Sequence, residues 1–151
     1  MILFRERLLP SRGLLVALLL LIPATLLVFL PINQTVGVVA AIALYLASCG
    51  TLIAISPVVE VTQERITVGR ASLPIEFAGE PEAYSGGEAT AERGVRLDAR
   101  AWIVFRGGID SVVKIPVVDE KDPAPYWLIS SRRPDQFVSA VSEAKRHTPS
   151  K

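Results

Sequence analysis

The chain contains few of the side chains that carry most enzymatic and metal-binding chemistry. Its 151 residues include one histidine, His147, in a polar C-terminal stretch, and one cysteine, Cys49, inside an apolar run. A Ser-His-Asp or Cys-His arrangement and a His/Cys zinc site cannot be assembled from residues placed in this way. A single cysteine also excludes an intramolecular disulfide. The sequence therefore predicts no catalytic residue, no metal site and no cofactor.

Charged residues are scarce in the first third of the chain. Residues 1–56 carry only Arg5, Glu6, Arg7 and Arg12, which leaves 13 Lys and Arg against 14 Asp and Glu in residues 57–151. A domain with this slightly acidic balance lacks the electrostatic footprint of a nucleic-acid-binding protein. Nucleic acid is therefore not an expected partner.

Two long uncharged runs dominate the N-terminal third. Residues 13–30 and 36–55 contain 18 and 20 uncharged residues. A helix of the shorter length spans about 27 Å, close to the thickness of a hydrocarbon core. The sequence therefore predicts a hairpin of two transmembrane helices, preceded by an N-terminal segment (residues 1–12) and joined by an external loop (residues 31–35). Pro23 is expected to kink the first helix.

Two other interpretations of these runs fit the sequence less well. A cleaved signal peptide agrees with the basic residues before the first run, but no A-x-A-type cleavage site follows and a second run begins directly after residues 31–35. A buried hairpin of a soluble protein would need a large surrounding core, which residues 57–151 cannot supply. The small residues Gly37 and Ala41, four apart, instead favour close packing of two membrane helices.

Basic residues flank the hairpin, whereas the loop between its helices has no charge. The flanking residues are Arg5, Arg7 and Arg12 on one side of the hairpin in sequence and Arg65 and Arg70 on the other. The positive-inside rule therefore predicts a multi-pass protein of the plasma (inner) membrane with both the N- and C-termini in the cytoplasm.

Beyond residue 57 the apolar pattern becomes short and alternating. Strands are predicted over residues 58–61, 65–68, 73–77, 101–105, 111–118 and 126–130, and residues 79–100 read as an irregular excursion with a short helical turn near 89–93. In the last of these strands, Trp127 is expected in the core. The strands predict an antiparallel sheet.

A helix is predicted at the end of this region. Pro134 and Asp135 suit its first turn, and basic residues suit its last. Its apolar stripe is expected to contain Phe137, Val138, Val141 and Ala144. Residues 57–147 are therefore predicted to form an α+β domain, followed by a tail (residues 148–151). Its expected architecture is an antiparallel sheet or barrel like that of pleckstrin-homology (PH) domains, with a C-terminal helix.

Three segments of the chain resemble a known family. They read FRERLLP, RASLPIEFAGEPEAY and DPAPYWLISSRRPDQFVSAV, and they resemble the small actinobacterial two-helix membrane proteins grouped as domain-of-unknown-function family 3093. The chain departs from the family pattern at Glu120, where a proline would repeat Asp-Pro, and at Gly107 and Gly108, which replace a bulkier pair. The resemblance implies the two-helix topology and a PH-like domain. It implies no reaction and no catalytic residue.

Two functions remain open on the sequence alone. The first is a non-catalytic, membrane-tethered interaction module that docks a protein partner in or at the membrane. The alternative is a domain that binds anionic lipid headgroups, and an uncharacterised enzyme ranks third. Arg132 and Arg133 at the helix N-terminus, with Arg65 and Arg70 after the hairpin, are the candidates for contact with a partner or lipid. Self-association is left open.

Overall fold

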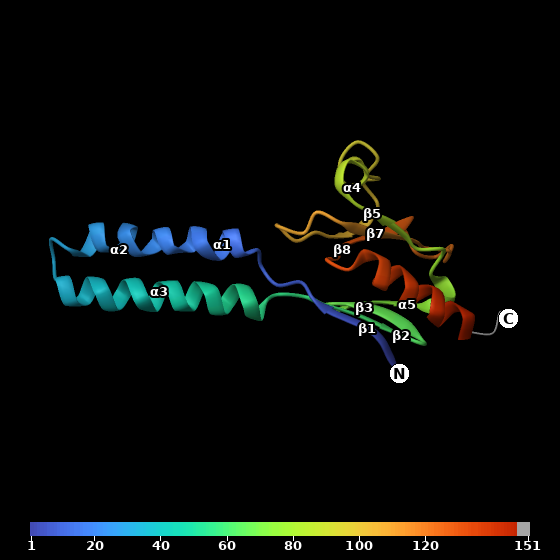
Figure 1. Cartoon of the computed structure of the whole chain (residues 1–151), viewed down its shortest axis with the longest axis horizontal. Coiled ribbons are helices and arrows are strands. Elements are labelled where there is room, and N and C mark those ends of the chain that lie inside the picture. The colour runs from blue at the N-terminus through green and yellow to red at the C-terminus, as the bar shows by residue number, and fades with distance from the viewer. Residues whose placement is uncertain (148–151) are drawn as a thin grey trace. The chain divides into compact units, whose positions relative to one another are not determined.

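The computed structural model describes residues 1–147, which divide into two compact units (Figure 1). Residues 9–56 form a helical hairpin, and residues 1–8 together with residues 57–147 form a folded domain. The predicted tail, residues 148–151, lies outside the described residues. The domain is thus built from chain on both sides of the hairpin.

The first arm of the hairpin changes helix type part-way along. It consists of α1 (Arg12–Ala17), the 3₁₀ segment η1 (Leu18–Leu20) and α2 (Leu21–Phe29). Pro23 has no backbone N–H to donate to the carbonyl of Leu19, and this loss favours a tighter turn over the residues just before it. The irregularity expected at Pro23 therefore takes the form of a short 3₁₀ segment.

The second arm is the single helix α3 (Gln34–Ala54). It begins after Asn33, whose side-chain oxygen accepts a backbone N–H from the first turn at 3.1 Å. Gly37 and Ala41 are buried, and a Cβ built on Gly37 would lie 3.0 Å from the Cβ of Phe29. Small residues therefore allow the two arms to pack closely, as their spacing predicted.

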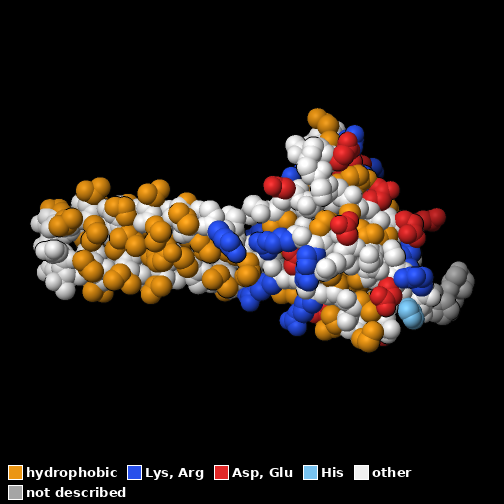
Figure 2. Space-filling model, viewed as in Figure 1, with side chains coloured by type: hydrophobic (Ala, Val, Ile, Leu, Met, Phe, Trp, Pro, Cys, Tyr) orange, Lys and Arg blue, Asp and Glu red, His pale blue; other side chains and the backbone are white. Residues whose placement is uncertain are grey.

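Both arms are long and apolar enough to cross a membrane. The candidate spans are Arg12–Phe29 and Gln34–Ala54, with 18 and 21 residues. Only 6% of the first span and 11% of the second span is buried, whereas the core helices of a soluble protein are mostly buried. Apolar side chains cover much of the hairpin face visible in Figure 2. The spans coincide closely with the two uncharged runs of the sequence.

The first sheet of the domain joins the strand before the hairpin to the strands after it. Its four antiparallel strands lie side by side in chain order: β1 (Ile2–Arg7), β2 (Val58–Thr62), β3 (Arg65–Val68) and β4 (Ala71–Pro74). Just beyond the β1–β2 ladder, the backbone N–H of Leu8 donates to the carbonyl of Pro57 at 3.0 Å. The chain thus leaves the domain and returns to it at adjacent positions.

Strand β1 is the main difference from the sequence interpretation, which placed residues 1–12 outside the domain. Phe4, Glu6 and Leu8 are all buried in the domain. Their alternation is that of a strand with one buried face, but Glu6 occupies one of the inward positions and exposed arginines lie on either side of it. A charged residue at a buried position therefore concealed the strand. Cleavage after the first arm would remove β1 from the domain.

The second sheet is mixed rather than wholly antiparallel. Its strands are β5 (Glu82–Tyr84), β6 (Trp102–Val104), β7 (Val112–Pro116) and β8 (Tyr126–Ser130), in the order β5-β7-β8-β6. Neighbouring strands are antiparallel except β6 and β8, which are parallel. The region read as irregular, residues 79–100, contains β5 and helix α4 (Gly86–Arg93). The connection through α4 carries the chain from β5 at one edge of the sheet to β6 at the other edge. Because β6 runs in the same direction as β5, it is parallel to β8.

Helix α5 (Pro134–His147) packs against both sheets and completes the main core (Figure 1). Phe137, Val141 and Ala144 are buried as predicted, but Ala140 is buried in place of Val138, which is half-buried. The predicted strand over residues 73–77 divides instead into the end of β4 and the 3₁₀ turn η2 (Ile75–Phe77). The sequence therefore predicted the buried residues of α5 more accurately than it predicted where the strands end.

Strand β8 is buried along its whole length because both faces of its sheet are covered. Trp127 faces the main core, where its ring centroid lies 4.1 Å from that of Trp102. On the opposite face, Tyr126 and Leu128 pack with Ala89 of α4 in a second apolar cluster. The prediction that Trp127 belongs to the core is confirmed.

The position of β1 predicts that residues 57–147 alone are unstable. A chain in which a four-residue Gly/Ser turn joins residues 1–8 to residues 57–147 should unfold cooperatively in urea, because Leu8 and Pro57 are already hydrogen-bonded neighbours. Residues 57–147 without β1 should lose at least about 3–5 kcal/mol, the usual cost of truncating one buried aromatic such as Phe4. Tryptophan fluorescence would follow both transitions. Equal stability of the two chains would contradict this role of β1.

Candidate functional site

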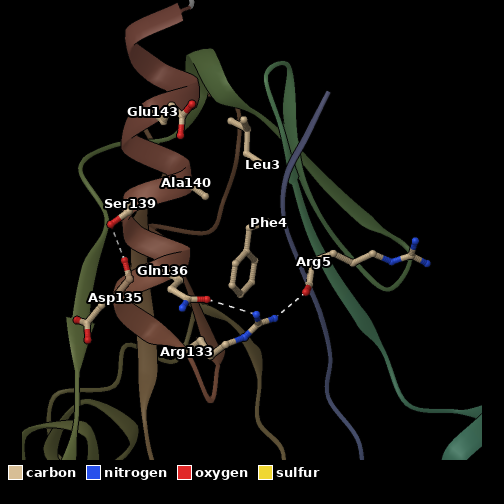
Figure 3. Close-up of a pocket in the computed structure, with 9 residues that line it drawn as sticks. All are labelled: Leu3, Phe4, Arg5, Arg133, Asp135, Gln136, Ser139, Ala140 and Glu143. Atoms are coloured by element: carbon tan, nitrogen blue, oxygen red, sulfur yellow. Dashed lines mark hydrogen bonds between the residues drawn. The ribbon is translucent and has the colours of Figure 1, made fainter.

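A shallow groove of about 440 Å³ runs between the edge strand β1 and helix α5 (Figure 3). Phe4 and Ala140 approach each other across it. Polar and charged side chains of α5 surround this apolar floor. The full lining is Leu3, Phe4, Arg5, Arg133, Asp135, Gln136, Ser139, Ala140 and Glu143.

The backbone of β1 faces two ways. The backbone N–H of Leu8 bonds directly across to Pro57. In an antiparallel pair, the backbone groups of every second residue from Leu8 towards the N-terminus therefore bond to β2, and those of the residues between them point away from β2. Arg5 is one of these outward-facing residues. Its carbonyl accepts a hydrogen bond from Nη2 of Arg133 at 2.8 Å, on the side of β1 that faces α5. The groove therefore lies beside the edge strand of the first sheet.

Arg133, one of the predicted contact residues, closes one end of the groove (Figure 3). Besides its bond to Arg5, its Nη1 donates to Oε1 of Gln136 at 3.3 Å, and its guanidinium lies 5.0 Å from the ring centroid of Phe4. Phe4 in turn stacks on Phe137 with 5.1 Å between ring centroids. The guanidinium of Arg133 thus links the edge strand to the helix, and its Nη1 and Nη2 atoms both donate hydrogen bonds within the domain.

A buried carboxylate, Glu6, holds the segment that leads into α5. One of its oxygens accepts the hydroxyl of Ser131 at 2.6 Å, and the other accepts the backbone N–H of Arg132 at 2.9 Å. Ser131 also accepts the backbone N–H of Arg133 at 3.1 Å. A negative charge near a helix N-terminus is favourable because the helix dipole is positive there. Nothing in the sequence signals this partnership, because Glu6 and Ser131 are 125 residues apart.

The four arginines proposed from the sequence do not form one site. Arg132 and Arg133 are adjacent to Glu6 and the groove, whereas Arg65 and Arg70 lie at opposite ends of β3. Arg70 occupies the turn after β3, where Gly69 donates its N–H to the carbonyl of Val58 at 2.9 Å. Arg65 lies about 10 Å further along the strand. We call the end of the domain that contains Leu8 and Pro57 the hairpin-proximal end; Arg65 lies at the other end.

A second charged cluster lies on the far face of the second sheet, away from the groove. The carboxylate of Glu92 is buried and contacts Nζ of Lys114 at 2.9 Å and Nη1 of Arg96 at 3.4 Å. Lys114 also lies 4.5 Å from the ring centroid of Tyr126. Burial alone would raise the pKa of Glu92, but the hydrogen bonds and charges of Lys114 and Arg96 lower it. The Glu92 carboxylate of α4 is therefore kept ionised, and its contact with Lys114 of β7 fixes this helix to the sheet.

Among residues 1–147, no group of three or more His, Cys, Asp or Glu side chains is arranged to hold a metal ion. His147 ends α5, and Cys49 lies within the separate hairpin unit. The groove lining includes neither residue type. The groove combines an edge strand, an apolar floor and charged walls, which are features of peptide-binding sites.

The contacts of Arg133 predict a stability difference between two arginines that look alike in sequence. Arg133→Gln should destabilise the protein by about 1–2 kcal/mol, because it removes a charged hydrogen bond to β1 and a cation–π contact. Arg65→Gln, at an exposed strand position, should change the stability by no more than about 0.5 kcal/mol. Urea denaturation of the joined domain would measure both. Equal, near-zero effects would show that the Arg133 contacts contribute nothing.

Comparison with known proteins adds a family but no activity. No characterised protein and no experimentally determined structure matches the chain. A family model described as protein of unknown function (DUF3093) matches residues 3–141. The match includes most of β1, both candidate membrane spans, both sheets and α5 as far as Val141, so that Glu143 alone of the groove lining lies beyond it. The chain therefore belongs to the DUF3093 family of proteins of unknown function.

Proposed function

We propose that the protein is a membrane-anchored, non-catalytic interaction module whose domain holds an extended segment of a partner protein in the groove between β1 and α5. The observation that supports this function is the position of β1 at the edge of its sheet, where Leu3, Phe4 and Arg5 line the groove. An edge strand presents backbone N–H and C=O groups in the spacing that another strand needs. The partner segment would add as a further strand beside β1.

Strand addition divides affinity and specificity between two kinds of contact. Main-chain hydrogen bonds to β1 would bind any extended segment. A bond to the carbonyl of Arg5 would replace the one that Arg133 makes. Side chains that alternate along the segment then meet the groove. Leu3, Phe4 and Ala140 offer an apolar floor for every second side chain.

Charge gives the groove a preference for basic segments. Asp135 and Glu143 line it from α5, and the guanidinium of Arg133 already bonds to Arg5 and Gln136. The side chain of Arg5 points away from α5 (Figure 3) and lies 3.8 Å from a carboxylate oxygen of Glu60. The carboxylates favour Lys or Arg in the partner. The proposed ligand is therefore an extended segment in which an apolar residue is flanked by basic ones.

The strand connections support the PH-like interpretation of the domain. An antiparallel meander (β1 to β4), a second antiparallel set (β5, β7 and β8) and a closing C-terminal helix form the outline expected for that fold, with α4 and β6 inserted between β5 and β7. Domains of this kind include peptide binders that use strand addition. This support is an analogy at the level of the fold, because one fold serves many functions.

We further propose that the hairpin crosses the plasma membrane twice and leaves the domain in the cytoplasm. The pairing of β1 with β2 requires both flanks of the hairpin to lie on one side. The arginines of these flanks and the uncharged loop favour the cytoplasmic side. A fluorescent protein fused to the C-terminus should be bright, and alkaline phosphatase fused there should be inactive. An active phosphatase would reverse the assignment.

A peptide selection on the full-length protein in detergent tests the proposed groove. Phage-displayed random 12-residue peptides should be enriched in sequences that alternate apolar residues with Lys or Arg. Glu143→Lys should weaken binding of the enriched peptides at least about tenfold, because it places a like charge beside the bound segment. Glu64→Lys makes the same charge change at an exposed turn and should leave binding intact.

Thermal melting of both variants would confirm that they remain folded. Amide hydrogen exchange should show that an enriched peptide protects β1 more than β4, the other edge of the same sheet. Peptides whose binding is indifferent to Glu143→Lys, or a selection that enriches nothing, would contradict the groove as the binding site.

A further inference from the structure

The hairpin-proximal end of the domain gathers several loops that are distant in sequence. The backbone carbonyl of Leu8 accepts a hydrogen bond from Nε of Arg106 at 3.1 Å, and the N–H of Arg106 donates to Oγ of Ser130 at 3.2 Å. The turn that contains Arg70 bonds to Val58 at the same end. The loops after β3, β6 and β8 therefore surround the two points where the chain passes to the hairpin.

These loops make the hairpin-proximal end basic, although the domain as a whole is close to neutral. Four arginines lie there: Arg7, Arg70, Arg106 and Arg132. Of the acidic residues beside them, Glu6 is buried with both oxygens hydrogen-bonded, and Asp110 is exposed. The opposite end carries exposed carboxylates, including Glu64 and Glu76.

An exposed aromatic side chain lies among these arginines. Phe105 precedes Arg106 and is 37% exposed, and Ile103 of β6 is 44% exposed. Gly107 and Gly108 follow, and Gly108 has a φ of +79°, a conformation that favours glycine. A phenylalanine between a basic residue and a tight turn can enter the headgroup region of a bilayer while the arginine remains at the phosphates.

The covalent connections limit how far this end can lie from the hairpin. Only Leu9 and Pro10 separate Leu8 from Ser11, the N-cap of α1. Three residue steps span at most about 10 Å, which is close to the Debye length at physiological salt. If the two arms cross a bilayer, as the proposed function requires, Leu8 and the Arg106 side chain bonded to it are tied to within about this distance of the start of the first span.

We propose that the hairpin-proximal end is a docking surface for anionic phospholipid headgroups, held by the arginines and by Phe105. This inference rests on the membrane anchoring in the proposed function but not on the groove. Docking would fix the orientation of the domain on the membrane. The groove between β1 and α5 would then face partners at a set height above the bilayer.

Hydrogen exchange on the full-length protein in nanodiscs tests this surface. Residues 69–71 and 105–110 should exchange at least about threefold more slowly in discs of phosphatidylcholine with 30% phosphatidylglycerol than in phosphatidylcholine alone. Raising NaCl from about 50 to about 500 mM should remove the difference, because salt screens exposed charges. The β2–β3 turn at the opposite end should exchange equally in both discs. Equal exchange of residues 69–71 and 105–110 in the two lipids would overturn the proposal.

Variants separate lipid docking from the stability of the loops. The double variant Arg70→Gln with Phe105→Ser should lose the lipid-dependent protection, and Arg65→Gln at the other end should retain it. Arg106 is left unchanged because its side chain holds Leu8. Lipid-dependent protection that survives the double variant would also overturn the proposal. Failure of the chain to enter nanodiscs would instead contradict membrane anchoring, and peptide binding in detergent would still test the groove separately.

Discussion

The pairing of β1 with β2 is the constraint on which the rest of the structure depends. These strands are joined through two candidate membrane spans, yet they are direct neighbours in one sheet, with Arg7 opposite Val58. The hairpin therefore behaves as a long insertion in a tight β-turn. If the hairpin crosses a membrane, as proposed, this pairing requires both of its ends to lie on the same side.

Two further contacts convert this pairing into a closed core. Phe4 of the edge strand stacks on Phe137 of α5. Glu6 accepts hydrogen bonds from Ser131 and Arg132, in the segment that precedes the helix. A buried carboxylate is costly unless its oxygens are hydrogen-bonded, and each oxygen of Glu6 has a donor. The same contacts place α5 at the distance from β1 that leaves a groove, so the candidate site is a product of the core packing.

Much of this architecture could be read from the sequence. Uninterrupted apolar runs identified the hairpin, a short apolar strand placed Trp127 in the core, and helical spacing identified three of the buried residues of α5. The sequence did not reveal β1, because Glu6 breaks the apolar alternation that marks a strand. It also did not reveal the direction of β6 or the role of Arg133. Both depend on residues far away in the chain: β6 lies beside β8, and Arg133 binds the backbone of Arg5.

The partners of β1 are all synthesised long after β1 itself. The ribosome makes β1 first, but β2 follows only after both arms of the hairpin, and Ser131 follows much later. Closing such a large loop is entropically unfavourable for a free chain. If the translocon inserts the hairpin first, it brings the two ends together and shortens the effective loop. Membrane insertion of the hairpin would then speed the pairing of β1 with β2.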